Sequence, residues 1–295
     1  MKPHTILVTG GAGFIGSHIV EALVHNNHKV IVLDNLSTGS IKNIAHLQSA
    51  ITFIEADIRD IKNCINTAQN CNIIIHCAAL VSVVESCADP MTCLDVNVRG
   101  TLNMLQAAIK NKVERFIFSS SSAVYGNRNE SCAETDECVP LSPYGYSKWI
   151  GEHLCQKYAA LHKLHTVSLR YFNVFGPRQS VNSPYSAVIA QFSHYMKHNH
   201  QITIYGDGLQ TRDFVPVHDI VRANCYFALT HRNPLYGEIF NIASGESITI
   251  NEVVQQLQSK FPHFNAPITY KAARKGDIKH SRANCAKYRA LLHAQ

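Results

Sequence analysis

The stretch Thr5-Ile6-Leu7-Val8-Thr9-Gly10-Gly11-Ala12-Gly13-Phe14-Ile15-Gly16 decides the fold of this chain. A short apolar run leads directly into the spaced glycines Gly10, Gly13 and Gly16, and a helical pattern follows. Glycine permits the tight turn and lets the backbone approach a phosphate. The N–H groups at the start of such a helix, at Phe14 and Ile15, bind anions such as a diphosphate. The stretch therefore predicts a strand–turn–helix unit that holds a dinucleotide.

Apolar, β-branched runs alternate with helical patterns through the first half of the chain. Such an alternation requires a parallel sheet covered by helices on both faces. We therefore expect an α/β fold with a Rossmann-type, doubly wound parallel sheet over residues 1–172. The expected strands are Thr5–Thr9, Lys29–Asp34, Ile51–Glu55, Asn72–Cys77, Arg115–Ser119 and Thr166–Arg170. The expected helices lie near Gly16–His25, Met91–Lys110 and Tyr144–His162.

The second half of the chain has a different pattern, with frequent proline and glycine between short strands such as Ile202–Tyr205 and Glu238–Ile242. An amphipathic helix is expected over Asn251–Lys260. We expect residues 173–295 to form mainly a smaller α/β lobe that binds the substrate, with late segments able to rejoin the main sheet.

An acidic residue, Asp34, closes the second expected strand, 18 residues after Gly16. A carboxylate at this place accepts hydrogen bonds from the ribose hydroxyls of the adenosine and repels a 2′-phosphate, which favours NAD over NADP. Asp57, at the end of the third expected strand, is a weaker candidate for the adenine edge. The alternative for Asp34 is a turn residue before Asn35.

Composition places limits on the class of protein. The chain has 295 residues, of which 46% are hydrophobic and 16% charged, as in ordinary globular proteins. A formal charge of +6 without a basic cluster argues against nucleic-acid binding, and fits either anionic small molecules or a solvated surface. No signal sequence or membrane span is expected, and the ten scattered cysteines are typical of reduced thiols in a cytoplasmic protein.

Seventeen histidines raise the question of a metal site. His194, His198 and His200 cluster in the sequence, and His162 and His165 are close together. Neither group has a cysteine or carboxylate at ligand spacing, so no metal is expected.

Tyr144 and Lys148 lie at positions i and i+4 of an expected helix, and therefore on one face. A phenol with its usual pKa of about 10 is a poor base, but a nearby ammonium and a positively charged nicotinamide would lower that pKa. Taken alone, the pair could be a surface pair. Together with the glycine motif and with the serines at 119–122 after a strand, it indicates that Tyr144 is the base of a redox site.

These motifs make the chain resemble the extended short-chain dehydrogenase/reductase family from end to end. Further matching blocks are His76-Cys77-Ala78-Ala79, Asn97-Val98-Arg99-Gly100-Thr101, Ser120-Ser121-Ser122-Ala123-Val124-Tyr125-Gly126 and Arg170-Tyr171-Phe172-Asn173-Val174-Phe175-Gly176-Pro177. The resemblance implies that Ser121 relays or positions a proton, with Ser120 as the alternative register. It implies that Lys148 holds the nicotinamide ribose and that the protein is a homodimer. The cofactor contacts that it implies are Gly10, Gly13, Phe14, Ile15, Gly16, Asp34, Asn35, Asp57, Ile58, Ala78, Ala79, Asn97, Tyr144 and Lys148.

Within that family the chain is most similar to the 4-epimerases of nucleoside-diphosphate sugars. The implied reaction removes a hydride from C4 of the sugar to NAD+ and returns it to the other face of the 4-keto intermediate. Related dehydratases and decarboxylases carry acidic residues where this chain has Ser122-Ala123. Because elimination needs an additional acid and base, we disfavour those reactions.

The resemblance also implies a set of residues that bind the nucleotide sugar. The small Ser281 stands where hexose-restricted epimerases carry a tyrosine, so we expect the site to accept a 2-acetamido group. Ser82 is either a substrate-facing serine or a polar turn residue. The alternative functions are a UDP-uronic acid 4-epimerase and a catalytically silent NAD-binding protein. The implied substrate contacts are Ser82, Ser121, Asn173, Ala187, Val188, Tyr205, Arg212, Arg274, Asp277 and Ser281.

Overall fold

The computed structural model describes residues 3–128, 130–180, 188–230, 235–273 and 278–293. Within this part of the chain, seven parallel strands form the main sheet in the order β11-β6-β5-β4-β1-β2-β3. The order reverses between β4 and β1, where an open α/β sheet forms its ligand crevice. The α/β class and the Rossmann-type sheet expected from the sequence are confirmed. The strands are β1 (Thr5–Thr9), β2 (Lys29–Asp34), β3 (Ile51–Glu55), β4 (Ile73–His76), β5 (Arg115–Ser121), β6 (His165–Tyr171) and β11 (Tyr236–Ile242).

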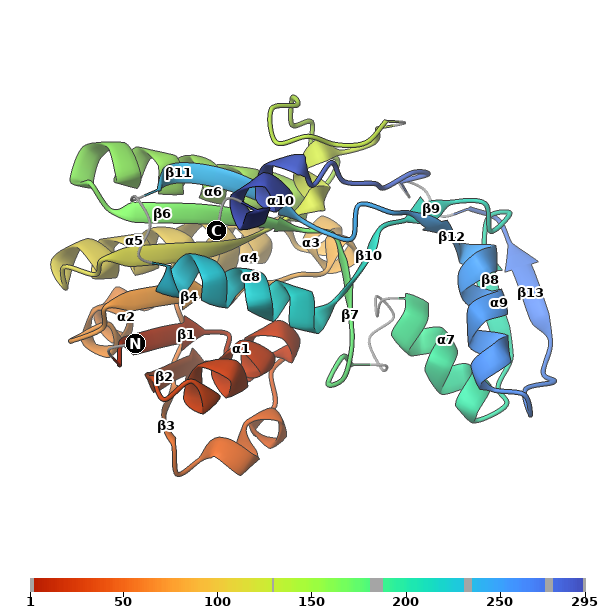
Figure 1. The fold of residues 1–295 in the computed structure, drawn as a ribbon, viewed down its shortest axis with the longest axis horizontal. Coiled ribbons are helices and arrows are strands. Elements are labelled where there is room, and N and C mark those ends of the chain that lie inside the picture. Colours follow the sequence, from red (N-terminus) through yellow and green to blue (C-terminus); the bar gives the residue numbers. More distant parts are fainter. Residues whose placement is uncertain (1–2, 129, 181–187, 231–234, 274–277, 294–295) are drawn as a thin grey trace.

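Helices cover the sheet on two faces because successive strand residues point to opposite sides. Ile6 and Val8 pack toward α1 (Phe14–His25) and α8 (Val217–Leu229), whereas Leu7 belongs to a core on the other side. That second core also contains buried residues from three helices: α2 (Ile61–Thr67), α5 (Gly100–Lys110) and α6 (Pro143–His162). Figure 1 shows these layers around the sheet.

A smaller lobe forms a separate apolar core, seen on the right of Figure 1. Its parallel strands β8 (Ile202–Tyr205) and β13 (Ile268–Lys271) pack with α7 (Val188–Lys197) and α9 (Ile250–Lys260). Thr249 and Glu252 form a reciprocal capping box that starts α9. Short paired strands lie between the lobe and the main body: β7 (Asn173–Phe175), β9 (Thr211–Arg212), β10 (Phe214–Pro216) and β12 (Ile248–Thr249).

The second half of the chain also builds part of the main body. Strand β11 pairs with β6 at the edge of the main sheet, and α8 packs on α1. Helix α10 (Ala286–His293) packs on β11. The boundary at residue 172 is therefore not a spatial division, and the assignment of substrate binding to residues 173–295 stays a prediction.

The expected helix over residues 91–110 is interrupted in the structure. It consists of α4 (Pro90–Leu94), a π-helical turn over Asp95–Arg99 and α5, and it is preceded by α3 (Val83–Ala88). The helical stretch predicted near residues 91–110 is present, but the π-helical turn within it was not predicted. The π-helical turn, with its extra residue per turn, contains Asn97, whose buried amide bonds to Leu80 and Ser147 outside the helix. Short 3₁₀ turns occur at Ile41–Asn43, Ala45–Leu47 and Ser122–Tyr125.

All ten cysteines of the chain are thiols. Within the described ranges, no helix has both the length and the apolar character that crossing a membrane requires.

Candidate active site

The glycine loop joins β1 to α1 and can hold no side chain at its two tightest points. Gly10 has a φ of +67°, and a Cβ there would stand 2.7 Å from the backbone nitrogen of Ala78. A Cβ on Gly16 would overlap the carbonyl oxygen of Gly10. Gly13 precedes the first residue of α1 and provides no capping side chain. The first N–H groups of α1, at Phe14, Ile15 and Gly16, therefore have no intrahelical acceptor, and the loop fits a diphosphate.

Asp34 ends β2 directly beside this loop. Its two carboxylate oxygens accept the N–H groups of Ala12 and Leu36, each at 2.9 Å, and the residue is buried. A carboxylate can accept further hydrogen bonds, so Asp34 can also bind the ribose hydroxyls expected there. The turn role and the cofactor role considered for Asp34 are therefore compatible.

Asp57 and Asn35 form a separate group at the ends of β3 and β2. Arg59 donates two side-chain hydrogen bonds to Asp57, and these bonds lower the pKa of Asp57 to about 2. Asn35 donates to the same carboxylate at 2.9 Å. Ile58 is buried against Gly100. Asp57 is thus ionised and already bonded, and an adenine contact would add to these bonds.

Tyr144 and Lys148 lie on the first two turns of α6, close to the end of β5. Ser142 caps the helix by accepting the N–H of Gly145 at 3.1 Å, and Pro143 begins it. The Lys148 ammonium donates to the Ser119 carbonyl oxygen at 2.8 Å and lies 5.9 Å from the centre of the Tyr144 ring. The predicted pair therefore shares one helix face near the sheet crevice.

Burial has the largest effect on the ionisation of this pair. Burial raises the pKa of Tyr144, and the hydrogen bond with Ser121 lowers it in part. Burial also lowers the pKa of Lys148 to about 8. The expected lowering of the Tyr144 pKa involves both Lys148 and a positively charged nicotinamide, and it stays a prediction. Activation of the phenol then depends on the positive charge of an oxidised nicotinamide.

The structure distinguishes Ser121 from Ser120. The Ser121 hydroxyl accepts the N–H of Ala123 at 3.2 Å and lies near enough to Tyr144 to lower the pKa of its phenol. The Ser120 hydroxyl instead donates to Glu152 at 2.5 Å. Of these two serines only Ser121 affects the candidate base, and it is the serine chosen by counting back from Val124-Tyr125-Gly126.

The Asn97 side chain links two segments of the site by hydrogen bonds. Its amide oxygen accepts the N–H of Leu80 at 2.8 Å, and its amide nitrogen donates to the Leu80 carbonyl and to Ser147, each at 2.9 Å. Ser147 lies between Tyr144 and Lys148 on α6. Asn97 thus ties the loop that contains Ala78 and Ala79 to the catalytic helix, and its side chain is already engaged by the protein.

His76 is a site residue that the sequence analysis did not single out. Its Nδ1 lies 2.7 Å from the Thr9 hydroxyl and its Nε2 lies 3.1 Å from the Thr101 hydroxyl. Thr101 uses its own proton on the Asn97 carbonyl at 2.6 Å, so Nε2 of His76 must carry a proton and Nδ1 must accept. Burial lowers the pKa of His76 to about 3, so the imidazole is neutral and links the glycine loop to the π-helical turn.

The described substrate-side residues converge on Asp213, which the sequence analysis missed. The Asn173 amide and backbone N–H both donate to the Asp213 carbonyl, at 3.1 and 3.0 Å. Ser281 and Arg212 are neighbours through Thr211, whose carbonyl oxygen accepts the Ser281 N–H at 3.2 Å and the Arg212 guanidinium at 2.9 Å. The structure therefore brings together three residues that are far apart in the sequence.

Asp213 itself has no solvent exposure and accepts four hydrogen bonds. Its Oδ1 accepts the backbone N–H of Ser244 at 2.9 Å and the Ser244 hydroxyl at 2.7 Å. Its Oδ2 accepts the N–H groups of Gly245 at 3.0 Å and Ala283 at 3.1 Å. No sequence motif indicates this arrangement, because the partners of the carboxylate come from two segments that are distant in the sequence.

The other predicted substrate contacts have mixed outcomes. Ser82 caps α3 by accepting the Glu85 N–H at 3.1 Å, which matches the structural alternative considered for it. Tyr205 ends β8 and Val188 begins α7. Ala187, Arg274 and Asp277 lie outside the described residues.

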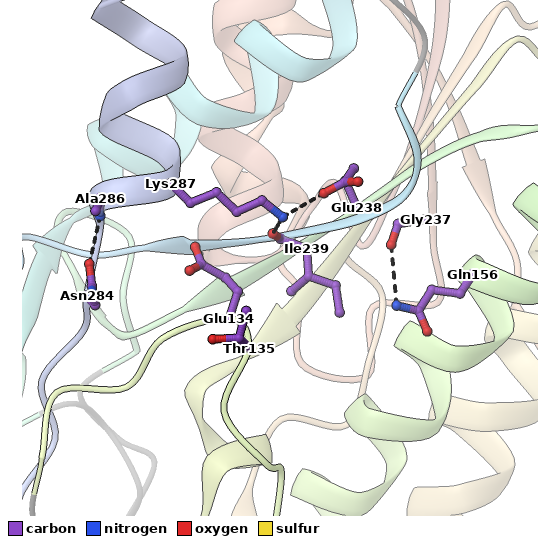
Figure 2. Close-up of a pocket in the computed structure, with 9 residues that line it drawn as sticks. All are labelled: Glu134, Thr135, Gln156, Gly237, Glu238, Ile239, Asn284, Ala286 and Lys287. Carbon is purple, nitrogen blue, oxygen red and sulfur yellow. Dashed lines mark hydrogen bonds and ion pairs between the residues drawn. The ribbon is translucent and has the colours of Figure 1, made fainter.

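A separate pocket of about 510 Å³ lies against β11 and α10 and contains none of the predicted site residues (Figure 2). Lys287 and Glu238 form an ion pair across it at 2.6 Å.

Across the described ranges, no group of three His, Cys, Asp or Glu side chains is arranged to hold a metal ion. Near the end of α7, the ring centres of His194 and His198 lie 4.6 Å apart, and those of His198 and His200 lie 6.0 Å apart.

The fold defines an NAD-binding α/β enzyme, and Ser121, Tyr144 and Lys148 are its candidate catalytic residues. The NAD dependent epimerase/dehydratase family matches residues 6–243. The chain belongs to this family, and its cofactor is NAD.

Several solved and curated proteins are similar over most of their length. A UDP-N-acetylglucosamine 4-epimerase from Methanobrevibacter ruminantium, in complex with UDP-N-acetylmuramic acid, is 38% identical with a TM-score of 0.92 and covers 98% of this chain and 92% of its own. A UDP-glucose 4-epimerase with UDP-glucose from Thermotoga maritima is 36% identical, with a TM-score of 0.90 and coverages of 97% and 91%. A UDP-N-acetyl-alpha-D-glucosaminuronate decarboxylase of Bacillus cytotoxicus is 35% identical over 90% of this chain and 82% of its own. The family therefore includes several reactions on nucleotide-linked sugars, and the chain is an enzyme of this kind.

Proposed function

We propose that this enzyme is an NAD-dependent 4-epimerase of UDP-hexoses, which interconverts UDP-N-acetylglucosamine with UDP-N-acetylgalactosamine and UDP-glucose with UDP-galactose. The observation that carries the proposal is the Ser121–Tyr144–Lys148 group at the end of β5, with the neutral side chains of Ser122 and Ala123 beside it. That set provides one base for one hydroxyl and no second acid or base for an elimination.

The residues of the chain have distinct tasks in this reaction. Tyr144 takes the proton of the sugar 4-hydroxyl and gives it back, and the Ser121 hydroxyl donates to the Tyr144 oxygen as negative charge develops on it. Lys148, held at the Ser119 carbonyl, supplies the neighbouring positive charge. NAD, when bound, accepts a hydride from C4 and later returns it.

The Arg212–Ser281 neighbourhood supports the acetamido substrate. A small side chain at 281 leaves room beside the sugar, and a guanidinium nearby suits a diphosphate. A uronic acid substrate would instead require a cation facing C6, and the two cations among the proposed substrate contacts, Arg212 and Arg274, are assigned to the diphosphate. NAD and nucleotide sugars are cytoplasmic metabolites, so we propose a cytoplasmic enzyme.

We also propose that the enzyme is a homodimer that pairs through the helices near Met91–Lys110 and Tyr144–His162. Met91 on α4 is 75% exposed and Leu161 on α6 is 74% exposed, and such apolar exposure marks an interaction surface when it is contiguous. Light scattering should give twice the 32.8 kDa mass of one chain, and Met91→Glu should lower it. A monomeric wild type would contradict the dimer.

The decisive experiment is to incubate the NAD-loaded enzyme separately with UDP-N-acetylglucosamine and UDP-glucose and to measure the 4-epimers. We expect conversion of both, and a loss of at least about 100-fold in kcat for Tyr144→Phe. No epimer from either sugar would refute the proposed activity. Equal turnover by the Phe variant would remove Tyr144 as the base.

A further inference from the structure

Three consecutive serines at the end of β5 each engage a different residue of α6. The Ser119 carbonyl accepts the Lys148 ammonium at 2.8 Å, and Ser121 lies near enough to Tyr144 to lower the pKa of its phenol. The Ser120 hydroxyl donates to Glu152 at 2.5 Å. Residues 144, 148 and 152 are spaced by four and share one face of the helix. The strand end and the helix are therefore matched at three successive points, and Glu152 is the one that the reaction does not use.

Glu152 is buried, and its carboxylate is bonded to the side chains of two other residues. The carboxylate has no solvent exposure and accepts a two-pronged bond from Arg170, with Nε at 2.8 Å and Nη2 at 2.7 Å. Arg170 stands on β6 and lies 4.7 Å from the centre of the Tyr125 ring. The Ser120–Glu152–Arg170 set thus connects β5, α6 and β6 about two helical turns along α6 from the candidate base.

The contacts continue away from the catalytic residues toward β11. The Tyr125 hydroxyl donates to the Asn241 side chain at 2.7 Å, and the Asn241 N–H donates to Glu134 at 2.8 Å. Glu134 lines the pocket drawn in Figure 2, so the network ends at the outer edge of the sheet. This continuity anchors Glu152 on both sides, from the strand that carries Ser121 to the edge strand.

We infer that Glu152 is a positioning residue that, through Ser120 and Arg170, fixes the alignment of α6 against β5 and so holds Tyr144 at Ser121 and Lys148 at Ser119. A buried ion pair is an inefficient way to stabilise a fold, because apolar residues of similar size often do as well or better. What the ion pair adds is a defined orientation of the helix. A two-pronged guanidinium–carboxylate bond with a third donor fixes the helix rotation and translation, which apolar packing leaves looser.

The electrostatics agree with this role. The charge of Glu152 contributes to raising the pKa of Lys148 against the larger effect of burial. Glu152 therefore helps to keep the Lys148 ammonium protonated near neutral pH, while Arg170 balances the carboxylate.

Ser120→Ala is the sharpest test, since Glu152→Gln would leave the Arg170 charge buried without its partner and would destabilise the fold. Ser120→Ala removes only the strand-to-helix bond and keeps the ion pair. We expect kcat for UDP-hexose epimerisation to fall about tenfold, with KM changed less than about twofold, because a small misplacement of a catalytic group costs rate rather than binding. Ser120→Thr, which keeps the hydroxyl, should recover most of kcat.

The matched control is Thr166→Ala. The Thr166 hydroxyl on β6 also donates to α6, at the Cys155 carbonyl at 2.9 Å, but toward the opposite end of the strand. Both variants lose one buried bond between the sheet and α6, so their melting temperatures should fall by similar amounts. Only Ser120→Ala should lose kcat.

The inference rests on the proposed function for its rate assay, so a second measurement separates the two. The pKa of the Tyr144 phenol can be titrated in the NAD-loaded protein by ultraviolet difference absorbance, with Tyr144→Phe as the reference. In Ser120→Ala the Ser121 hydrogen bond weakens and the phenol pKa should rise by about half a unit, whereas Thr166→Ala should leave it unchanged. If Ser120→Ala matches Thr166→Ala in both measurements, Glu152 only stabilises the fold and the inference is overturned. If the wild type epimerises no UDP-hexose, the proposed function fails and the titration alone decides this inference.

Discussion

Asp213→Asn replaces one carboxylate oxygen by an amide nitrogen at the junction of the two bodies. The amide can still accept two hydrogen bonds on Oδ1 from Ser244. On the other side, the N–H groups of Gly245 and Ala283 would face a donor instead of an acceptor. The substitution therefore removes two charge-assisted bonds at almost constant volume.

The expected magnitude follows from those two bonds. At about 1.5 kcal/mol each, their loss lowers the free energy of unfolding by about 3 kcal/mol. For a chain of this length that corresponds to a fall of about 6 °C in Tm. The segment before Ala283 carries Ser281, and the Asp213 backbone holds Asn173, so the proposed sugar contacts shift as well.

The assay is steady-state epimerisation together with thermal unfolding. We expect KM for the UDP-sugar to rise about tenfold, equivalent to about 1.4 kcal/mol of binding, with kcat within about threefold of wild type. Tyr144, Lys148 and Ser121 stand on α6 and β5 and do not contact Asp213, which is why kcat is spared. Asp60→Asn makes the same chemical change at an exposed carboxylate that caps α2, and asparagine caps a helix equally well, so it should change neither quantity. A fall in kcat with an unchanged KM would refute the reasoning.

Three further predictions follow from the site. Lys148→Met should lower kcat by about 100-fold or more without unfolding the protein. The fold should tolerate the change because burial already disfavours the ammonium and lowers the pKa of Lys148 to about 8. A stability loss as large as that of a core cavity would argue against this. His76 has a pKa of about 3 in the folded chain and 6.5 in the unfolded chain, so the unfolded state binds one more proton between these values. The free energy of unfolding should therefore decline as the pH falls below 6.5, by up to about 1.4 kcal/mol per pH unit. In denaturant unfolding, the plot of this free energy against pH should be shallower for His76→Gln by the equivalent of one proton, and parallel plots would contradict the assignment. Ser281→Tyr should reduce kcat/KM for UDP-N-acetylglucosamine much more than for UDP-glucose, whereas equal losses for both sugars would count against the size argument.

The local features of this protein could be predicted from its sequence because their signals are local. The glycine loop, the apolar runs of β1 to β6 and the Tyr144–Lys148 spacing each depend on residues within one element. The strand at Glu238–Ile242 was predicted from its own pattern, but its pairing with β6 has no local signal. The interruption near Asn97 could not be predicted from periodicity, because it depends on bonds to Leu80 and Ser147 from other segments.

The site residues missed by the sequence analysis share a physical cause. His76 and Asp213 act through buried hydrogen bonds whose partners are distant in the sequence, such as Thr101 for His76 and Ala283 for Asp213. The polarity of such a residue is visible in the sequence, but its burial is not. The effect of burial on the Tyr144 pKa could not be predicted for the same reason, since it becomes known only from the packing around the ring.

The place of β11 at the border of the main sheet has a consequence for how the polypeptide matures on the ribosome. Until residue 242 has been synthesised, β6 presents an edge whose backbone hydrogen-bonding groups are unpaired. The apolar face that later packs against Phe227 and Phe240 stays exposed to water. The cofactor-binding body therefore cannot close early as an independent unit during translation. A nascent fragment released before that point would expose a template for strand addition, so premature termination should yield aggregates rather than a smaller NAD-binding protein.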